Sequence, residues 1–142
     1  MNVTAEGPHI AQQSGSYVEK TASTAAALTI AASDTITGAR ILRRYILVDT
    51  TGGNVTLTID TGANLDSAFV NMRVNDAIEF GVLHYTVTAN SVTVTLTGVP
   101  PAGITYLGIT GSDVTLTSEQ KAWFALQKTA ANTFRFVLCS SN

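Results

Sequence analysis

Only two histidines, His9 and His84, could supply a general base or a ring-nitrogen metal ligand. His9 lies in a stretch without periodicity, whereas His84 lies within a strand-like alternation, so nothing in the sequence brings the two rings together. No serine occupies a Gly-x-Ser-x-Gly turn, and the chain has no His-x-His or cysteine pair for zinc. The sequence therefore predicts no catalytic residue, no metal site and no enzyme. It favours a satisfied or surface strand residue for His84.

The carboxylates are scattered along the chain and not paired. Most aspartates stand beside Gly, Asn, Ser or Thr, as turn and cap residues do, and no Asp-x-Asp-x-Asp spacing indicates calcium. Glu79 alternates with apolar neighbours and should face out of its strand. Gly52-Gly53 lacks the Gly-Lys-Ser/Thr ending of a phosphate loop. We therefore predict no cofactor, and we read these aspartates as structural: Asp34, Asp49, Asp60, Asp66, Asp76 and Asp113.

The aromatic residues and the cysteine offer two further kinds of site. Four rings could form a carbohydrate-binding platform if they cluster on one outer face: Tyr45, Tyr85, Tyr106 and Trp123. Trp123 precedes Phe124, so in a strand one ring faces the core and the other is exposed or at an interface. Cys139, the only cysteine, cannot form an intrachain disulfide. Its apolar surroundings predict a small buried side chain, and the alternative is a reactive thiol near Arg135.

Composition limits the possible partners. Of the 142 residues, 45% are hydrophobic and only 13% charged, about half the usual ~25%, so short neutral side chains should cover the surface and tolerate contact with other proteins. The net charge of −2 and the small cluster of Arg40, Arg43 and Arg44 give no footprint for nucleic acid. No apolar run approaches the roughly 20 residues of a membrane span, and the start lacks signal-peptide features. We expect a protein made in a cytoplasm, with no membrane partner.

Residues 1–22 differ from the remainder of the chain. They contain breakers and no sustained period, which predicts an extended N-terminal arm ahead of a single β domain over residues 23–142. Ile10, Tyr17 and Val18 are the apolar residues with which this arm could bind a neighbouring surface. The alternative is a frayed terminus without a partner.

The domain itself shows the period of two that half-buried strands show. Residues 55–59, 92–97 and 114–117 alternate apolar side chains with Thr, and Phe134, Phe136 and Leu138 are set against Thr133 and Arg135. The Gly and Asn residues at 49–54 predict a hairpin, and residues 129–132 predict the turn of a terminal hairpin that follows a Trp123–Phe124 strand. Leu65 and Phe69 at i and i+4 predict one short helix, capped by Asn64 or Gly62.

These patterns predict an all-β fold. We expect about eight to nine short strands and one short helix in an antiparallel β-sandwich or barrel, jelly-roll-like in arrangement, with the N-terminal arm outside it. An apolar face that changes parity near Gly81 predicts a bulge or a strand passing between two sheets.

Several stretches together resemble small β-rich decoration (cement) proteins encoded among the head genes of tailed phages. They read RYILVDTTGGNVTLTI at 44–59, RVNDAIEF at 73–80, NSVTVTLTG at 90–98 and NTFRFV at 132–137. The resemblance implies a virion structural protein, a homotrimer that binds the major capsid protein on the outer capsid surface and stabilises the shell. The arm residues Ile10, Tyr17 and Val18 would be candidate capsid contacts. No residue-level site carries over from the family.

Two other functions stay open. A phage tail fibre, spike or knob domain shares the Thr-rich β habit, although the chain has no heptads or repeats. A carbohydrate-binding module comes third.

Overall fold

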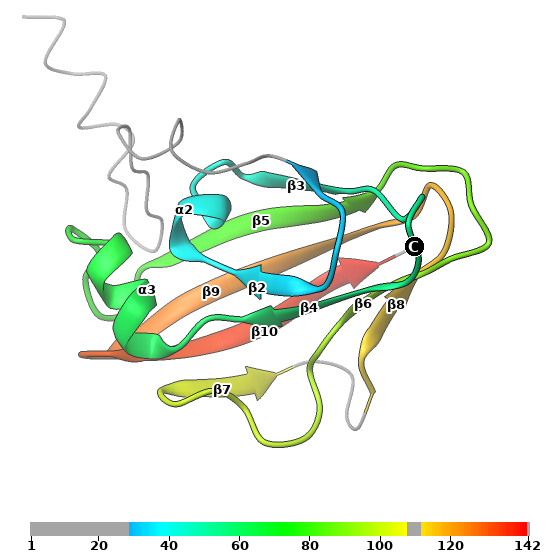
Figure 1. Cartoon of the computed structure of the whole chain (residues 1–142). Helices are drawn as coiled ribbons and strands as arrows, with labels where there is room; N and C mark the ends of the chain where they lie inside the picture. Colours follow the sequence, from blue (N-terminus) through cyan, green and yellow to red (C-terminus); the bar gives the residue numbers. More distant parts are fainter. Residues whose placement is uncertain (1–28, 108–111, 142) are drawn as a thin grey trace, which may run out of the picture.

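A computed structural model of the chain describes residues 29–107 and 112–141 (Figure 1). The described residues form two mixed sheets and two short helices, α2 (Gly38–Ile41) and α3 (Gly62–Ala68). The large sheet has the order β1 (Thr29–Ile30), β3 (Tyr45–Val48), β5 (Ala77–His84), β9 (Lys121–Ala130), β10 (Thr133–Ser141) and β7 (Ile104–Leu107). The small sheet has the order β2 (Asp34–Ile36), β4 (Val55–Ile59), β6 (Val92–Val94) and β8 (Val114–Leu116).

The first six strands alternate between the two sheets along the chain. β1, β3 and β5 lie in the large sheet, and β2, β4 and β6 in the small one. The chain therefore winds back and forth between the sheets as a coil, and each full turn of this coil adds one strand to each sheet. Neighbouring strands in this coil are parallel. The chain is mostly β, but the prediction of an antiparallel sandwich or barrel is wrong. An alternation of apolar and polar residues reports which face is buried and carries no information about strand direction.

The glycine-rich stretch at residues 49–54 joins β3 to β4, which belong to different sheets. It is therefore a corner between the sheets, and the hairpin predicted there is wrong. Gly53 has φ +138°, so the glycine does supply a conformation that other residues rarely adopt. Turn chemistry shows that the chain changes direction, but it does not show which strand the next segment pairs with.

The second half of the chain closes the coil with antiparallel strands. β8 pairs with β6, β9 with β5, and β10 with β9, which confirms the terminal hairpin and the strand at Trp123–Phe124. β7 pairs in parallel with the edge of β10 that faces away from β9. β5 keeps one inward parity at Ile78, Phe80 and Val82, and its register with β9 is unbroken through Gly81. The bulge or sheet change expected at Gly81 is therefore wrong.

The core lies between the sheets. The large sheet contributes four fully buried rings, those of Phe80, Phe124, Phe134 and Phe136. The centroids of Phe80, Phe124 and Phe136 are 5.1–6.0 Å apart. The small sheet contributes aliphatic side chains from each strand: Ile36, Val55, Leu57, Ile59, Val92, Val94, Val114 and Leu116. The predicted inward parity of these strands is thus confirmed, and burial of these side chains is the main stabilising term of the fold.

The two helices lie at the same end of the sheets (Figure 1). The helix predicted around Leu65 is confirmed as α3, but its cap is Thr61, whose Oγ1 accepts a hydrogen bond from the amide of Asn64. Asp66 ties this helix to the β9–β10 hairpin through an ion pair with Lys128 and a hydrogen bond from the amide of Asn132. α2 was not predicted, because four residues are too few for a helical period.

Candidate functional site

The outer side of the large sheet carries apolar side chains that are only partly covered. They alternate with core residues along β3, β5, β7, β9 and β10 and are half-buried or exposed. We call this surface the aromatic face. It consists of Tyr45, Leu47, Leu83, Leu107, Trp123, Ala125 and Val137.

An aromatic pair lies near the middle of this face. Strand register places Tyr45 beside Gly81 and Gly81 beside Trp123, so the two rings flank a glycine. Their centroids are 5.3 Å apart with an interplanar angle of 74°, an edge-to-face contact. A Cβ atom on Gly81 would lie 3.1 Å from the ring of Trp123. The glycine therefore leaves the room in which the tryptophan packs down onto the sheet.

The aromatic face remains accessible although its rings touch. Tyr45 is 53% exposed and Leu107 is 42% exposed, and the other members are half-buried. Exposed charges on the same side of the sheet include Glu79, Lys121 and Arg135. Rigid aromatic groups within a polar surround are the composition of protein interfaces. As expected, Phe124 is buried while its neighbour Trp123 is on the outside.

The outer side of the small sheet is different and presents threonine. Thr56, Thr93 and Thr115 form one row across three strands, and Thr35 and Thr58 are neighbours in a second row. We call this surface the threonine face, defined as Thr35, Thr56, Thr58, Thr93 and Thr115. Its hydroxyl groups can be satisfied by water, so the face has no need of a partner.

A polar cluster lies where the corners after β3 and β5 meet. The Nδ1 of His84 is 3.2 Å from the carbonyl oxygen of Leu116, and because a carbonyl only accepts, Nδ1 carries the hydrogen. The Oγ1 of Thr50 then donates to Nε2 over 2.7 Å. Thr86 and Asn90 complete the cluster through the backbone of Thr50.

The hydroxyl–imidazole contact at Thr50 and His84 has the geometry of a nucleophile beside a base. However, both residues are 0% exposed, so no substrate can reach the hydroxyl group in this arrangement. His84 is the satisfied structural histidine that the sequence favoured, and the cluster holds the two corners together. His9 lies outside the described residues.

The aspartates act locally, as predicted. Asp49 accepts hydrogen bonds from the side chain and the amide of Thr51, which lower the pKa of its carboxyl. Burial alone would raise the pKa of Asp66, but hydrogen bonds from Lys128 and Asn132 and the charge of Lys128 outweigh it and lower that pKa. Similar turn, cap or edge contacts engage Asp34, Asp60, Asp76 and Asp113.

Cys139 corrects another prediction, because its side chain is exposed and not buried. The register of β10 shifts between Leu138 and Ser140, so Cys139 is the extra residue of a bulge and faces solvent. Partial burial of the thiol and the charge of Glu79 raise the pKa of Cys139. A raised pKa disfavours the thiolate, the reactive form.

The four candidate rings of a sugar platform do not form one surface. Tyr45 and Trp123 meet on the aromatic face, Tyr85 is exposed just after β5, and Tyr106 turns inward against Phe136. The arm residues Ile10, Tyr17 and Val18 lie outside the described residues. Sequence reasoning missed Leu47, Leu83 and Val137 as members of the site. The continuous apolar run Ile46-Leu47-Val48 could have indicated this surface. An apolar residue at an outward-facing position of a strand indicates that the outer side of the sheet is covered or binds a partner.

No family model matches this sequence, and neither curated proteins nor solved structures gave a significant match. Within residues 29–107 and 112–141, no cluster of His, Cys, Asp and Glu side chains could hold a metal ion. None of the helices in that part of the chain has the length and apolar character needed to cross a membrane.

Proposed function

We propose that this protein is a non-enzymatic structural protein of a virus particle, a decoration protein that binds the outer surface of the capsid through its aromatic face. The observation that supports the proposal is the Tyr45–Trp123 pair, held on a rigid sheet and left accessible. The resemblance of residues 44–137 to phage head decoration proteins supplies the kind of partner, the major capsid protein.

The aromatic pair suits binding because its geometry exists before the partner arrives. Rings that are already packed lose little side-chain freedom on association, so more of the burial energy is available for affinity. Aromatic residues at the centre of an interface supply most of its binding energy, and a polar surround excludes water. The exposed charges of Glu79, Lys121 and Arg135 fit the role of that surround.

A homotrimer would strengthen such binding, since several modest contacts act together through effective concentration. The low fraction of charged residues, 13%, also supports close packing of copies because it reduces repulsion between them. The N-terminal arm with Ile10, Tyr17 and Val18 would add a second contact to the shell. The protein would then be located on the outer capsid surface of the virion.

Co-sedimentation with empty shells of the corresponding major capsid protein tests the proposal. Tyr45→Lys places a charge on the aromatic face, and Thr56→Lys places the same charge on the threonine face. Burying an unpaired charge costs about 3 kcal/mol or more, so we expect Tyr45→Lys to weaken binding at least about 100-fold. Thr56→Lys should bind like the wild type. Equal binding by the two variants, or no binding by the wild type, would contradict the proposal.

One observation favours a tail fibre, spike or knob as the second candidate. The parallel stacking of β1, β3 and β5 and of β2, β4 and β6 is a coil that further turns would lengthen into a shaft. A host-recognition part of this kind would bind cell-surface glycans or proteins. Binding of the full chain to host cells but not to shells would favour this candidate over decoration.

A further inference from the structure

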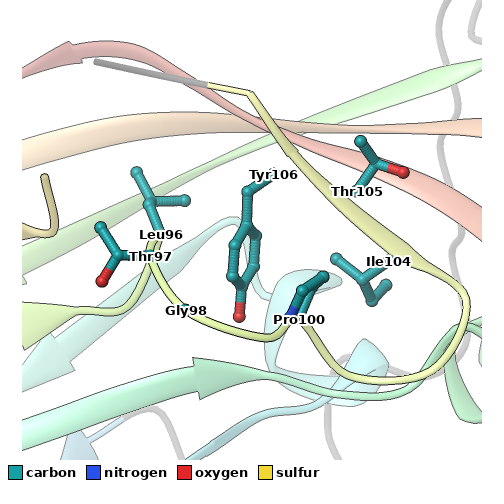
Figure 2. A pocket seen from close by; sticks show the side chains of 7 residues that line it. All are labelled: Leu96, Thr97, Gly98, Pro100, Ile104, Thr105 and Tyr106. Carbon is teal, nitrogen blue, oxygen red and sulfur yellow. The ribbon is translucent and has the colours of Figure 1, made fainter. Parts of the chain in front are cut away.

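A pocket lies between β7 and the loop that joins β6 to β7 (Figure 2). Neither Tyr45 nor Trp123 lines it. Its volume is about 420 Å³, within the range of ligand sites. Leu96, Pro100 and Ile104 provide apolar walls, and the backbone at Gly98 and the ring of Tyr106 complete it. The large sheet has two more strands than the small one. Opposite β7, the place of a small-sheet strand is therefore taken by the loop that joins β6 to β7 (Figure 2).

The hydroxyl group of Tyr106 is the unusual feature of this pocket. The ring packs edge-on against Phe136, with centroids 6.3 Å apart, and the hydroxyl points toward the Gly98–Pro100 loop (Figure 2). The hydroxyl oxygen is buried and has no hydrogen-bond partner among the described residues. Burial and the nearby charge of Asp113 raise the pKa of Tyr106, so the phenol stays protonated and can donate.

Asp113 does not satisfy this hydroxyl. Its Oδ1 accepts from the amides of Leu96 and Thr97, at 2.8 and 3.0 Å, and from the Thr97 hydroxyl at 2.8 Å. These bonds hold the loop in place, and the Tyr106 hydroxyl has no acceptor within hydrogen-bond distance among the described residues. Buried polar groups are nearly always paired, and one that is not calls for a missing partner.

The backbone of β7 offers a second surface at the same place, because no strand among the described residues pairs with the edge of β7 that faces away from β10. The amide of Phe134 donates to the carbonyl of Gly103, and strand alternation then directs the backbone groups of residues 103, 105 and 107 toward β10. The amide and carbonyl of Tyr106 therefore face the free edge of β7. Thr105 and Tyr106 have opposite parity yet both line the pocket, so the pocket opens around this edge.

We propose that the pocket and the β7 edge together bind an uncharged, extended peptide segment of a partner protein. An apolar side chain of the peptide enters between Leu96, Pro100 and Ile104 and displaces the Gly98–Pro100 loop, which covers the Tyr106 hydroxyl in the free protein. A backbone carbonyl of the peptide then accepts a hydrogen bond from that hydroxyl. The peptide backbone pairs with Tyr106 at the strand edge, which is the β-strand addition mode of recognition. No charged side chain lines the pocket, which matches a neutral occupant.

A sugar fits the site less well than a peptide. Sugars stack on exposed ring faces, whereas the Tyr106 ring is packed into the core and half-buried. The free backbone edge would also stay unpaired beside a sugar. The inference does not depend on the decoration role, because the pocket is separate from the aromatic pair.

The test is an NMR titration of the isotope-labelled full chain with a capped peptide of alternating threonine and valine. We expect shifts in the amide signals of Gly98, Thr105 and Tyr106. Tyr106→Phe removes only the hydroxyl and should weaken binding about tenfold, the loss of one hydrogen bond, while the exposed Tyr85→Phe should change nothing. A peptide N-methylated at alternate amides should not bind.

Three results would overturn the proposal. These are an absence of shifts at Gly98, Thr105 and Tyr106, equal affinity of the wild type and Tyr106→Phe, or shifts at these amides with a linear oligosaccharide but not with the peptide. Because removal of an unpaired buried hydroxyl does not destabilise the free protein, the melting temperature of Tyr106→Phe should equal or exceed that of the wild type. Weaker binding by this variant could then not be explained by loss of the fold.

Discussion

The aromatic face and the threonine face are built on the same plan and end in different surfaces. Both sheets direct alternate apolar side chains inward, and in both the inner residues are buried. Outside, the small sheet carries rows of threonine, whereas the large sheet carries a tyrosine, a tryptophan and aliphatic side chains. Water satisfies the hydrogen bonds of the threonine hydroxyls on the outside of the small sheet, so this sheet needs no partner. The large sheet is left with apolar surface that burial against a partner would stabilise.

The same comparison separates the residues that determine stability, which face the core, from the residues that would determine binding, which face outward. Burial of every second side chain along each strand is enough to stabilise either sheet, so the outward-facing residues are free to vary. Where they are threonine, they support the strand by propensity alone. Where they are aromatic and fixed by a glycine, as at Gly81, they form a prepared contact. Variants placed on one side or the other should therefore affect different properties.

The largest effect on stability should come from the core beneath the aromatic face. Phe124→Ala removes a ring that contacts Phe80 and Phe136, and we expect a loss of about 3–5 kcal/mol in the free energy of unfolding. Val94→Ala beneath the threonine face removes fewer carbon atoms and should cost about 2 kcal/mol. Urea denaturation measures both. Equal losses would show that the phenylalanine cluster is no more important than the aliphatic layer.

Gly81→Val should damage the aromatic face without destroying the fold. The new side chain would occupy the space of the Trp123 ring, which lies 3.1 Å from the position of a Cβ. We expect a cost of about 1–2 kcal/mol and a red shift of the tryptophan emission as the ring turns to solvent. Thr93→Val, the matched change on the threonine face, should alter stability by about 0.5 kcal/mol or less. An unchanged emission spectrum would mean that Gly81 does not position Trp123.

Acid should weaken the small sheet. Hydrogen bonds from Leu96 and Thr97 lower the pKa of Asp113, beside β8, below its ordinary 3.8, and a hydrogen bond from Thr35 and contact with Arg40 lower that of Asp34 in β2. A carboxyl with a lowered folded pKa contributes stability that is complete above its ordinary value and is lost as the pH falls through the folded value.

Asp113→Asn should therefore reduce stability above about pH 5 and have progressively less effect at lower pH. Thr115→Val, which removes no ionisable group, is the control and should shift the stability curve equally at every pH. Thermal melts across the acid range measure the difference. A constant gap between the wild type and Asp113→Asn would contradict the assignment.

Much of the local structure could be predicted from the sequence, and the arrangement of the strands could not. The strands around Val55–Ile59 and Phe134–Leu138, the terminal hairpin and the helix at Leu65 follow from periods and turn residues. Strand direction and the exchange between sheets depend on contacts between residues far apart along the chain. The coil has no sequence repeat to reveal it, because its turns differ in length and residues.

The candidate site was predictable only in part, for the same reason. Tyr45 and Trp123 could be named as candidate surface rings from their types, and Trp123 from its position beside Phe124. Their meeting across Gly81 requires the registers of β3 with β5 and of β5 with β9, which no local pattern specifies. Cys139 was misplaced because a bulge leaves no clear mark in sequence.

Trp123 itself provides the most direct test of the central claim, because it is the only tryptophan of the chain and lies within the aromatic face. Acrylamide quenching of its fluorescence should be measured for the free protein and for the protein bound to capsid shells. If the aromatic face is the binding surface, quenching will fall and the emission will shift to shorter wavelength on binding. Binding to shells with unchanged quenching and emission would contradict the account.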